Sequence, residues 1–206
     1  MLNFCAPNLT MRVAVLLAVL LLATGASKAQ VPLPAGRSSA LDASVGYTYV
    51  DMNVPSSAHV GLNGVDTALT ASLLPRIGVR ADFCYARSGE LYGRKRYNDV
   101  MTYLGGPIAY PLRTRRVSIY VDALVGGARV SGVNEAENGG FYTGFVNKLA
   151  WSFGAGGNYQ LSSTLAVGFG LDYFHSSFFD TSGQTRGVWN PRATVSFIYS
   201  FGRHRR

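Results

Sequence analysis

A repeated two-residue alternation of apolar and polar side chains constrains this chain most. It is clearest over residues 41–49, where Leu, Ala, Val and Tyr alternate with Asp, Ser, Gly and Thr. Successive side chains of a β-strand point to opposite faces, so this segment predicts a strand with one apolar face. The pattern recurs at 77–86, 149–159, 165–173 and 192–201, and less regularly at 65–73, 100–110 and 117–130. Eight such segments without a helical period predict an all-β protein.

The connections between these segments alternate in length. We expect long connections at about 51–64, 87–99, 131–148 and 176–190, and short ones at 74–76, 111–116 and 161–164. Transmembrane barrels have short periplasmic turns and longer external loops. Each segment also has roughly the 9–11 residues that a tilted strand needs to cross a bilayer. We therefore predict an eight-stranded antiparallel up-and-down transmembrane β-barrel over residues 41–202, with both ends on the short-turn side.

Side-chain size predicts which face meets lipid. The apolar set includes Trp151, Phe153, Phe169 and Phe197, whereas the opposite set is mostly Gly, Ala, Ser, Thr and Asp. An eight-stranded barrel has room inside only for modest side chains, so the bulky set should face lipid and not a soluble barrel's interior. Aromatic residues near strand ends then predict two girdles at the membrane interfaces. They are Tyr47, Tyr49, Phe83, Tyr85, Trp151 and Tyr173 at the long-loop ends, and Tyr110, Tyr159, Tyr199 and Phe201 at the short-turn ends.

The start of the chain predicts export. Arg12 precedes an apolar run at 13–23, and small residues lead to Ala29, as in a cleavable signal peptide spanning 1–29. A short periplasmic segment (30–40) and a basic tail (203–206) would flank the barrel. Cleavage leaves 17 basic and 11 acidic residues. Such a surplus suits an anionic membrane surface, and export argues against nucleic acid as the partner. Cleavage also removes one of the two cysteines, so Cys84 has no disulfide partner.

Several short motifs resemble a known group of proteins. They are Leu62-Asn63-Gly64, residues 77–82, 103–107, 124–128 and 153–157, and a last strand ending in the aromatic Phe201. Together they resemble the small OmpA/OmpX-type outer-membrane β-barrels, the bacterial "outer membrane protein beta-barrel domain" proteins, over residues 41–202. These motifs say little about activity, and our first hypothesis is a non-enzymatic outer-membrane protein with a role in envelope integrity or surface contact. The resemblance also implies insertion by the barrel-assembly machinery, which reads such a terminal strand. We expect a monomer in contact with lipid and lipopolysaccharide, without a cofactor.

Charged residues on the small-residue face predict a polar network inside the barrel. Because an unpaired buried charge is unfavourable by several kcal/mol, these side chains should pair with one another. Their pairing would close the barrel; the alternative is a polar path for a small solute or ion. The set is Asp42, Asp66, Arg80, Asp82, Asp122, Asp172 and Arg192.

Two further clusters carry possible chemistry. His175 and Ser177 share the lipid-facing side of a strand close to Asp180, an arrangement that resembles outer-membrane lipid A deacylases. Phe178 stands where that family has Asn, and no Glu follows Glu137, so we expect no catalysis and keep a lipid A hydrolase as an alternative. The three histidines lie on separate segments, and no metal site is expected. Three basic residues in one long connection predict contact with lipopolysaccharide phosphates: Arg94, Lys95 and Arg96.

Overall fold

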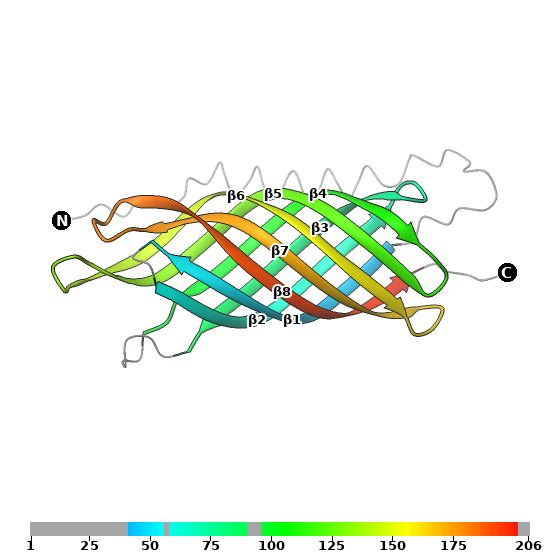
Figure 1. Cartoon of the computed structure of the whole chain (residues 1–206), viewed down its shortest axis with the longest axis horizontal. Helices are drawn as coiled ribbons and strands as arrows, with labels where there is room; N and C mark the ends of the chain where they lie inside the picture. Colours follow the sequence, from blue (N-terminus) through cyan, green and yellow to red (C-terminus); the bar gives the residue numbers. More distant parts are fainter. Residues whose placement is uncertain (1–40, 56–57, 90–95, 202–206) are drawn as a thin grey trace, which may run out of the picture. The chain divides into compact units, whose positions relative to one another are not determined.

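The computed structural model describes residues 41–55, 58–89 and 96–201, which form one closed β-barrel (Figure 1). Each strand pairs antiparallel with the next, and the eighth closes the ring against the first. The predicted eight-stranded up-and-down barrel is confirmed. No helix among the described residues is long and apolar enough to cross a membrane. The strands are β1 (Leu41–Val54), β2 (Ala58–Ser72), β3 (Ile77–Ser88), β4 (Asp99–Arg113), β5 (Val117–Glu135), β6 (Phe141–Gln160), β7 (Leu165–Phe179) and β8 (Thr185–Phe201).

The two ends of the barrel differ, because only one of them holds the first and last residues of the barrel. The terminal end, on the right in Figure 1, holds Leu41, Phe201 and the connections 73–76, 114–116 and 161–164. The hairpin end, on the left, holds Val54, Ala58, Ser88 and Asp99, together with the connections 136–140 and 180–184. The predicted signal peptide (1–29), the segment 30–40 and the basic tail (203–206) lie outside the described residues.

The predicted extent of three of the four long connections is wrong. The strands continue through most of 51–64, 131–148 and 176–190, so that β5 has 19 residues and β6 has 20. The fourth, predicted at 87–99, does separate β3, which ends at Ser88, from β4, which begins at Asp99. A tilted strand needs roughly 9–11 residues to cross a bilayer. The β5–β6 hairpin therefore projects well beyond the membrane, and the connection 55–57 is no longer than the opposite connection 73–76.

These extensions were not recognised in the sequence because the polarity of the two strand faces is reversed towards the hairpin end. There the outward residues are polar and the inward residues are apolar. Outward positions of β1 change from apolar Tyr49 to Asp51, while inward positions change from Thr48 to Val50 and Met52. The strand continues without a break, but its apolar face turns from lipid to the interior. β3 and β5 exchange their faces in the same way. Beyond the lipid, the wall is thus built like a water-soluble barrel, with its apolar side chains inside.

A band of exposed apolar side chains surrounds the middle of the barrel. Phe197, Leu149 and Phe153 are 68%, 63% and 58% exposed, and every strand contributes at least one large exposed apolar residue. Soluble monomers rarely expose apolar patches larger than about 300–600 Å², and a continuous belt exceeds any such patch. This exterior is stable only in contact with lipid, as in a transmembrane barrel.

Glycine allows the backbones of neighbouring strands to approach closely in the barrel wall. At Gly126 in β5, a Cβ atom would lie 2.0 Å from the carbonyl oxygen of Tyr103 in β4. At Gly105 in β4, the nearest atom to an added Cβ would be 3.6 Å away, an ordinary contact. The first position excludes any larger residue without movement of the backbone, whereas the second does not.

Candidate functional site

An apolar core fills the hairpin half of the interior. We call it the apolar plug. Its largest members, Phe174, Phe178, Met52 and Leu62, are at most 1% exposed. Half of its residues lie in segments that we expected to form external connections, 51–64, 131–148 and 176–190, so the sequence did not predict this core. The plug consists of Val50, Met52, Val54, Val60, Leu62, Cys84, Ala86, Val100, Val130, Val146, Phe174 and Phe178.

Buried amides join the hairpins around this plug. Asn98 Oδ1 accepts a hydrogen bond from the backbone of Val133 (2.7 Å), and the Asn98 backbone donates to Ser88 Oγ (2.8 Å). Across the barrel, Asn190 Nδ2 donates to Ser176 Oγ (3.0 Å). Both asparagines are fully buried. These bonds hold segments together near the ends of the strand ladders.

Below the plug, buried charges form a layer across the barrel, which we call the ion layer: Asp66, Asp82, Asp122, Asp172, Arg80 and Arg192. Arg192 lies at its centre, and its side chain is 1% exposed. Its Nη1 atom donates to Asp66 (3.3 Å) and Asp82 (3.0 Å), and its Nε atom donates to Asp172 (3.2 Å). One guanidinium therefore joins β2, β3, β7 and β8.

Arg80 extends the ion layer to the other side of the barrel. Its Nη2 atom donates to Asp82 (3.1 Å), and its Nη1 atom donates to Asp122 (3.4 Å). Asp82 thus contacts both arginines. The structure does not bring the seventh predicted member into the layer: Asp42 faces inward near the terminal end, and its Oδ1 atom has no hydrogen-bond partner among the described residues. It sits too far towards the end of β1 to reach either guanidinium.

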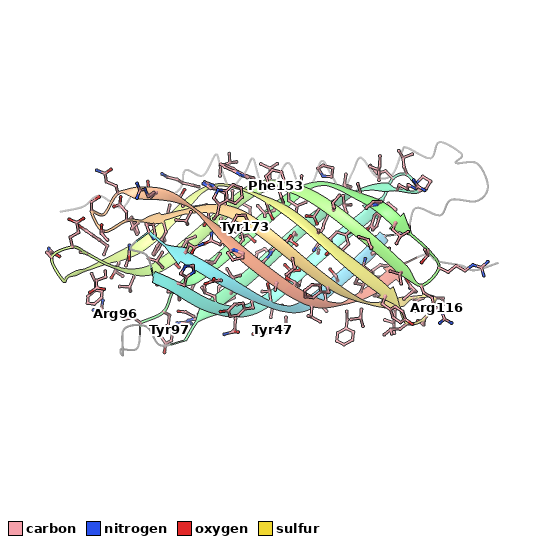
Figure 2. All side chains as sticks on the ribbon, viewed as in Figure 1. Tyr47, Arg96, Tyr97, Arg116, Phe153 and Tyr173 are labelled. Carbon is pink, nitrogen blue, oxygen red and sulfur yellow. The ribbon has the colours of Figure 1, made fainter. Side chains whose placement is uncertain are left out.

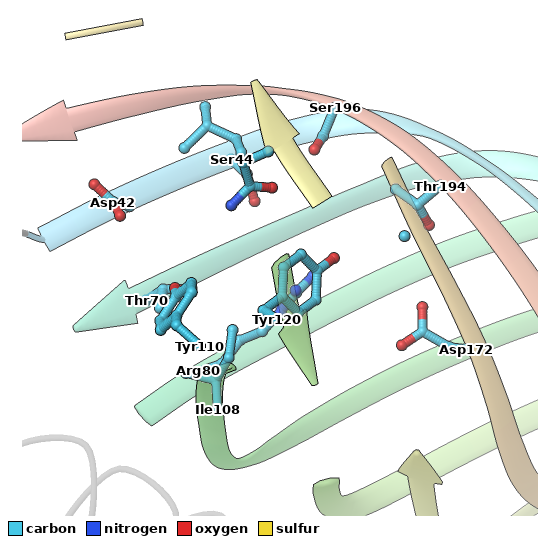
Figure 3. A pocket seen from close by; sticks show the side chains of 13 residues that line it. Asp42, Ser44, Thr70, Arg80, Ile108, Tyr110, Tyr120, Asp172, Thr194 and Ser196 are labelled. Atoms are coloured by element: carbon cyan, nitrogen blue, oxygen red, sulfur yellow. The ribbon is translucent and has the colours of Figure 1, made fainter. Parts of the chain in front are cut away.

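Two tyrosines pack inside the terminal half (Figure 3). Tyr110 and Tyr120 are 4% and 7% exposed, with their rings 6.4 Å apart, and Arg80 lies 5.5 Å from the Tyr120 ring. The prediction that Tyr110 belongs to the outer girdle is wrong. Even-numbered residues of β4 face inward from Val100 to Tyr110, which places this side chain in the interior. A cavity of about 30 Å³ remains between these rings and Asp172, room for about two water molecules.

The other predicted girdle residues lie on the outside of the wall. Tyr47, Tyr49, Phe83, Tyr85, Tyr159, Tyr173, Tyr199 and Phe201 are all more than two-fifths exposed. Trp151 also points outward and is half-buried against Trp189, at 6.3 Å between rings. Sequence reasoning missed Trp189 because it lies in a segment expected to be a loop. Figure 2 shows Phe153, Tyr173 and Tyr47 on the wall between the two ends.

The residues of the predicted lipid A hydrolase alternative, His175, Ser177 and Asp180, do not form a catalytic triad. The His175 ring stacks on Trp151 (4.2 Å between centroids), and its Nδ1 atom is buried without a hydrogen-bond partner among the described residues. Asp180 Oδ1 accepts hydrogen bonds from the Ser182 hydroxyl (2.7 Å) and the Gln184 backbone (2.9 Å), which lower the pKa of this exposed carboxyl. Asp180 therefore closes the β7–β8 turn and does not orient His175.

Basic side chains lie at the hairpin end, just beyond the apolar band. Of the predicted cluster, Arg94 and Lys95 lie outside the described residues, while the Arg96 guanidinium lies 4.1 Å from the centre of the Phe141 ring. Arg129 similarly covers Phe145 at 4.7 Å. We call Arg87, Arg96, Arg129 and Lys148 the basic rim. Figure 2 shows Arg96 at the hairpin end and Arg116 at the opposite end.

Within the basic rim, Arg129 stands at the lipid boundary. It is directly opposite Asn147 in the β5–β6 pair, two outward positions beyond Val125 of the apolar band. The Tyr103 hydroxyl donates to Asn147 Oδ1 (3.1 Å). A guanidinium, an amide and a tyrosine thus meet where lipid headgroups begin. No predicted site included Arg129, although a basic residue directly after the apolar positions of β5 marks the boundary.

No group of three or more His, Cys, Asp or Glu side chains suited to a metal ion occurs within residues 41–55, 58–89 and 96–201. Cys84 is buried and unpaired.

Comparisons with known proteins identify the fold. No family model matches the sequence, and no curated protein matches it either. Among solved structures, the chain resembles Ail, the attachment invasion locus protein of Yersinia pestis, at 15% identity and a TM-score of 0.56, covering 80% of this chain and 100% of Ail. It resembles Neisserial surface protein A at 10% identity and 0.58, covering 79% and 96%.

The outer membrane protein OprG from Pseudomonas aeruginosa is also similar, at 15% identity and a TM-score of 0.54, covering 80% of this chain and 97% of OprG. Identities this low establish the architecture alone. Joined with the apolar band, they identify this chain as an eight-stranded β-barrel of the bacterial outer-membrane type.

Proposed function

We propose that this barrel is a non-catalytic outer-membrane protein that acts through its outer surface and hairpins, in surface contact or envelope integrity. One observation carries the proposal: the apolar plug, the ion layer and the inner tyrosines occupy successive levels of the interior. A path for solutes would have to cross all three. The terminal cavity of about 30 Å³ is far smaller than the roughly 300 Å³ of a typical small-molecule pocket.

The partner that best fits the outer surface is anionic. In outer-membrane barrels the short turns face the periplasm, so the hairpin end and its basic rim face outward. The Arg129 guanidinium stacks on an aromatic ring, which leaves its N–H edge available for a phosphate. Lipopolysaccharide carries phosphates at this depth. Ail, a similar fold, forms a complex with the heparin analogue sucrose octasulfate, also a polyanion, and this supports the class of ligand.

The first experiment tests conduction. The purified barrel, inserted into planar bilayers, should give no steady single-channel conductance. Reproducible channels from the wild-type protein would contradict a closed interior. Heat-modifiable gel mobility and protease accessibility on intact cells check that the barrel is folded and that its hairpin end faces outward.

The second experiment tests the anionic partner. Binding of lipopolysaccharide to the barrel in phosphatidylcholine bicelles should weaken roughly tenfold in Arg129→Gln, the loss of about one charge-assisted hydrogen bond. Arg116→Gln removes the same charge at the terminal end and should leave binding unchanged. Equal binding of dephosphorylated lipopolysaccharide would refute phosphate recognition.

The third experiment tests catalysis. Ser177→Ala and the wild-type protein should release the same background amount of fatty acid from lipopolysaccharide. Release that depends on Ser177 would replace this proposal with a lipid A hydrolase.

A further inference from the structure

The ion layer contains more negative than positive groups. It has four carboxylates, from Asp66, Asp82, Asp122 and Asp172, but only the two guanidiniums of Arg80 and Arg192. Full ionisation would leave two uncompensated negative charges. The side chains of Asp82 and Asp122 are 0% exposed, so water does not compensate them from the surface. Buried charge of this kind is neutralised by a counter-ion or by a proton.

The available oxygen atoms show where neutralisation can occur. Asp82 uses both oxygens, Oδ1 towards Arg192 and Oδ2 towards Arg80. Asp66, Asp122 and Asp172 each use only Oδ2, Asp66 and Asp172 towards Arg192 and Asp122 towards Arg80. Asp122 Oδ1 is buried and has no hydrogen-bond partner among the described residues. A carboxylate oxygen in that position lacks a donor.

Two of these unused oxygens, Oδ1 of Asp122 and Oδ1 of Asp172, converge above one glycine. Asp122, Gly154 and Asp172 are direct neighbours across β5, β6 and β7. A Cβ atom on Gly154 would lie 2.2 Å from Asp172 Oδ1 and 2.4 Å from Asp122 Oδ1. The missing side chain therefore leaves the space in which both oxygens meet. Both oxygens lie within 2.4 Å of that one point, and two ionised carboxylates this close together would repel each other.

We propose that Asp122 and Asp172 share one proton above Gly154, as a carboxylic acid that donates a hydrogen bond to a carboxylate. The proton satisfies the orphan oxygen and halves the surplus charge of the ion layer. Each carboxyl keeps its second oxygen on an arginine, so the pair links the two halves of the layer. The guanidiniums beside both carboxyls disfavour a metal cation in the same space.

The groups that face the pair set its response to pH. Asp66 comes from β2, Arg80, Asp82 and Cys84 from β3, Tyr120 from β5 and Arg192 from β8, with Asp42 and Tyr110 further towards the terminal end. Both guanidiniums are already engaged by the second oxygens. Loss of the shared proton in alkaline solution would thus place two like charges together and loosen the barrel.

Infrared spectroscopy tests the proton directly. At neutral pH the refolded wild-type barrel should show the carbonyl band of a protonated carboxyl, and Asp122→Asn should lose it. Asp42→Asn removes another inward carboxylate outside the pair and should keep the band. A wild-type protein without the band, or a band that persists in Asp122→Asn, overturns the proposal.

Stability gives a second, independent readout. An asparagine at 122 can donate an N–H to Asp172, so Asp122→Asn should unfold at the same or a higher temperature than wild type. Asp82→Asn removes the same charge but breaks contacts to both arginines, and its unfolding constant should rise roughly a hundredfold. Equal destabilisation by both variants overturns the proposal. So does a chelator that destabilises the wild type but not Asp122→Asn, because a bound cation would then be the neutralising group.

Discussion

Replacement of Arg192 by Met should destabilise the barrel more than any change on its outer surface. Arg192 donates to three buried carboxylates at 3.0–3.3 Å. After its loss, Asp82 keeps Arg80, but Asp66 and Asp172 lose the cation that pairs with them. Removal of one partner from a buried ion pair costs about 3–5 kcal/mol, and two stranded carboxylates place this variant near the upper figure.

Urea unfolding in lipid vesicles measures this loss, with the fraction of folded barrel read from heat-modifiable gel mobility. Domains are commonly stable by about 5–15 kcal/mol, so Arg192→Met should unfold at much lower urea concentration or fail to refold. Arg192→Lys keeps the charge but loses the planar fork and should lie in between, about 2 kcal/mol below wild type. Arg116→Met, in an exposed turn, is the control and should stay within roughly 0.5 kcal/mol. A stability of Arg192→Met within about 1 kcal/mol of wild type would refute a structural role for the ion layer.

Three further outcomes follow from single positions. Gly126→Ala should destabilise the barrel by roughly 1–3 kcal/mol through overpacking, whereas Gly105→Ala should be neutral in the same unfolding assay; equal effects would contradict the close approach at Gly126. Cys84 is 0% exposed, so maleimide should label it only after unfolding, and rapid labelling of the folded barrel would contradict the apolar plug. The turn hydrogen bonds lower the folded pKa of Asp180 below its unfolded value, so their support is present above the unfolded pKa and is lost as pH falls through the folded pKa. The amide shift of Ser182 should therefore titrate below about pH 3.9; a midpoint at or above that value would contradict the turn geometry.

The lipid-facing side of the barrel was predictable because it depends on local pattern. In β7 and β8, large apolar residues such as Phe169 and Phe197 occupy every second position beside Gly, Ser or Thr. Strand geometry converts that alternation directly into two faces, whatever the neighbouring strands are. The strand number and the outward direction of the bulky set follow from it. Tyr110 was wrongly predicted to face outward, because it was assigned to the aromatic girdle from its place near a strand end. Its even-numbered position in β4, which faces inward, was not considered.

The hairpin end was not predictable by the same rule. Val50 and Met52 point into the barrel, as Asp42 and Thr48 do. The inward residues of β1 are polar where the strand crosses lipid and apolar where it extends beyond the lipid. The sequence does contain a signal, since polarity exchanges between odd and even positions within one uninterrupted strand. These segments do not fit a strand whose apolar residues all lie on one face. They do show two-residue alternation throughout if the apolar residues may change from the outward to the inward face within the strand.

By itself the sequence determined that eight strands cross lipid with their large apolar side chains outward, because strand periodicity and side-chain volume are local properties. Only the tertiary structure decided what closes the interior. Arg192 reaches Asp66 and Asp82, which lie 126 and 110 residues away along the chain, because ring closure pairs β8 with β1. Gly154 leaves space for Asp122 and Asp172 only because register makes the three residues neighbours. Such contacts depend on closure, register and tilt, which a linear pattern of polarity does not encode.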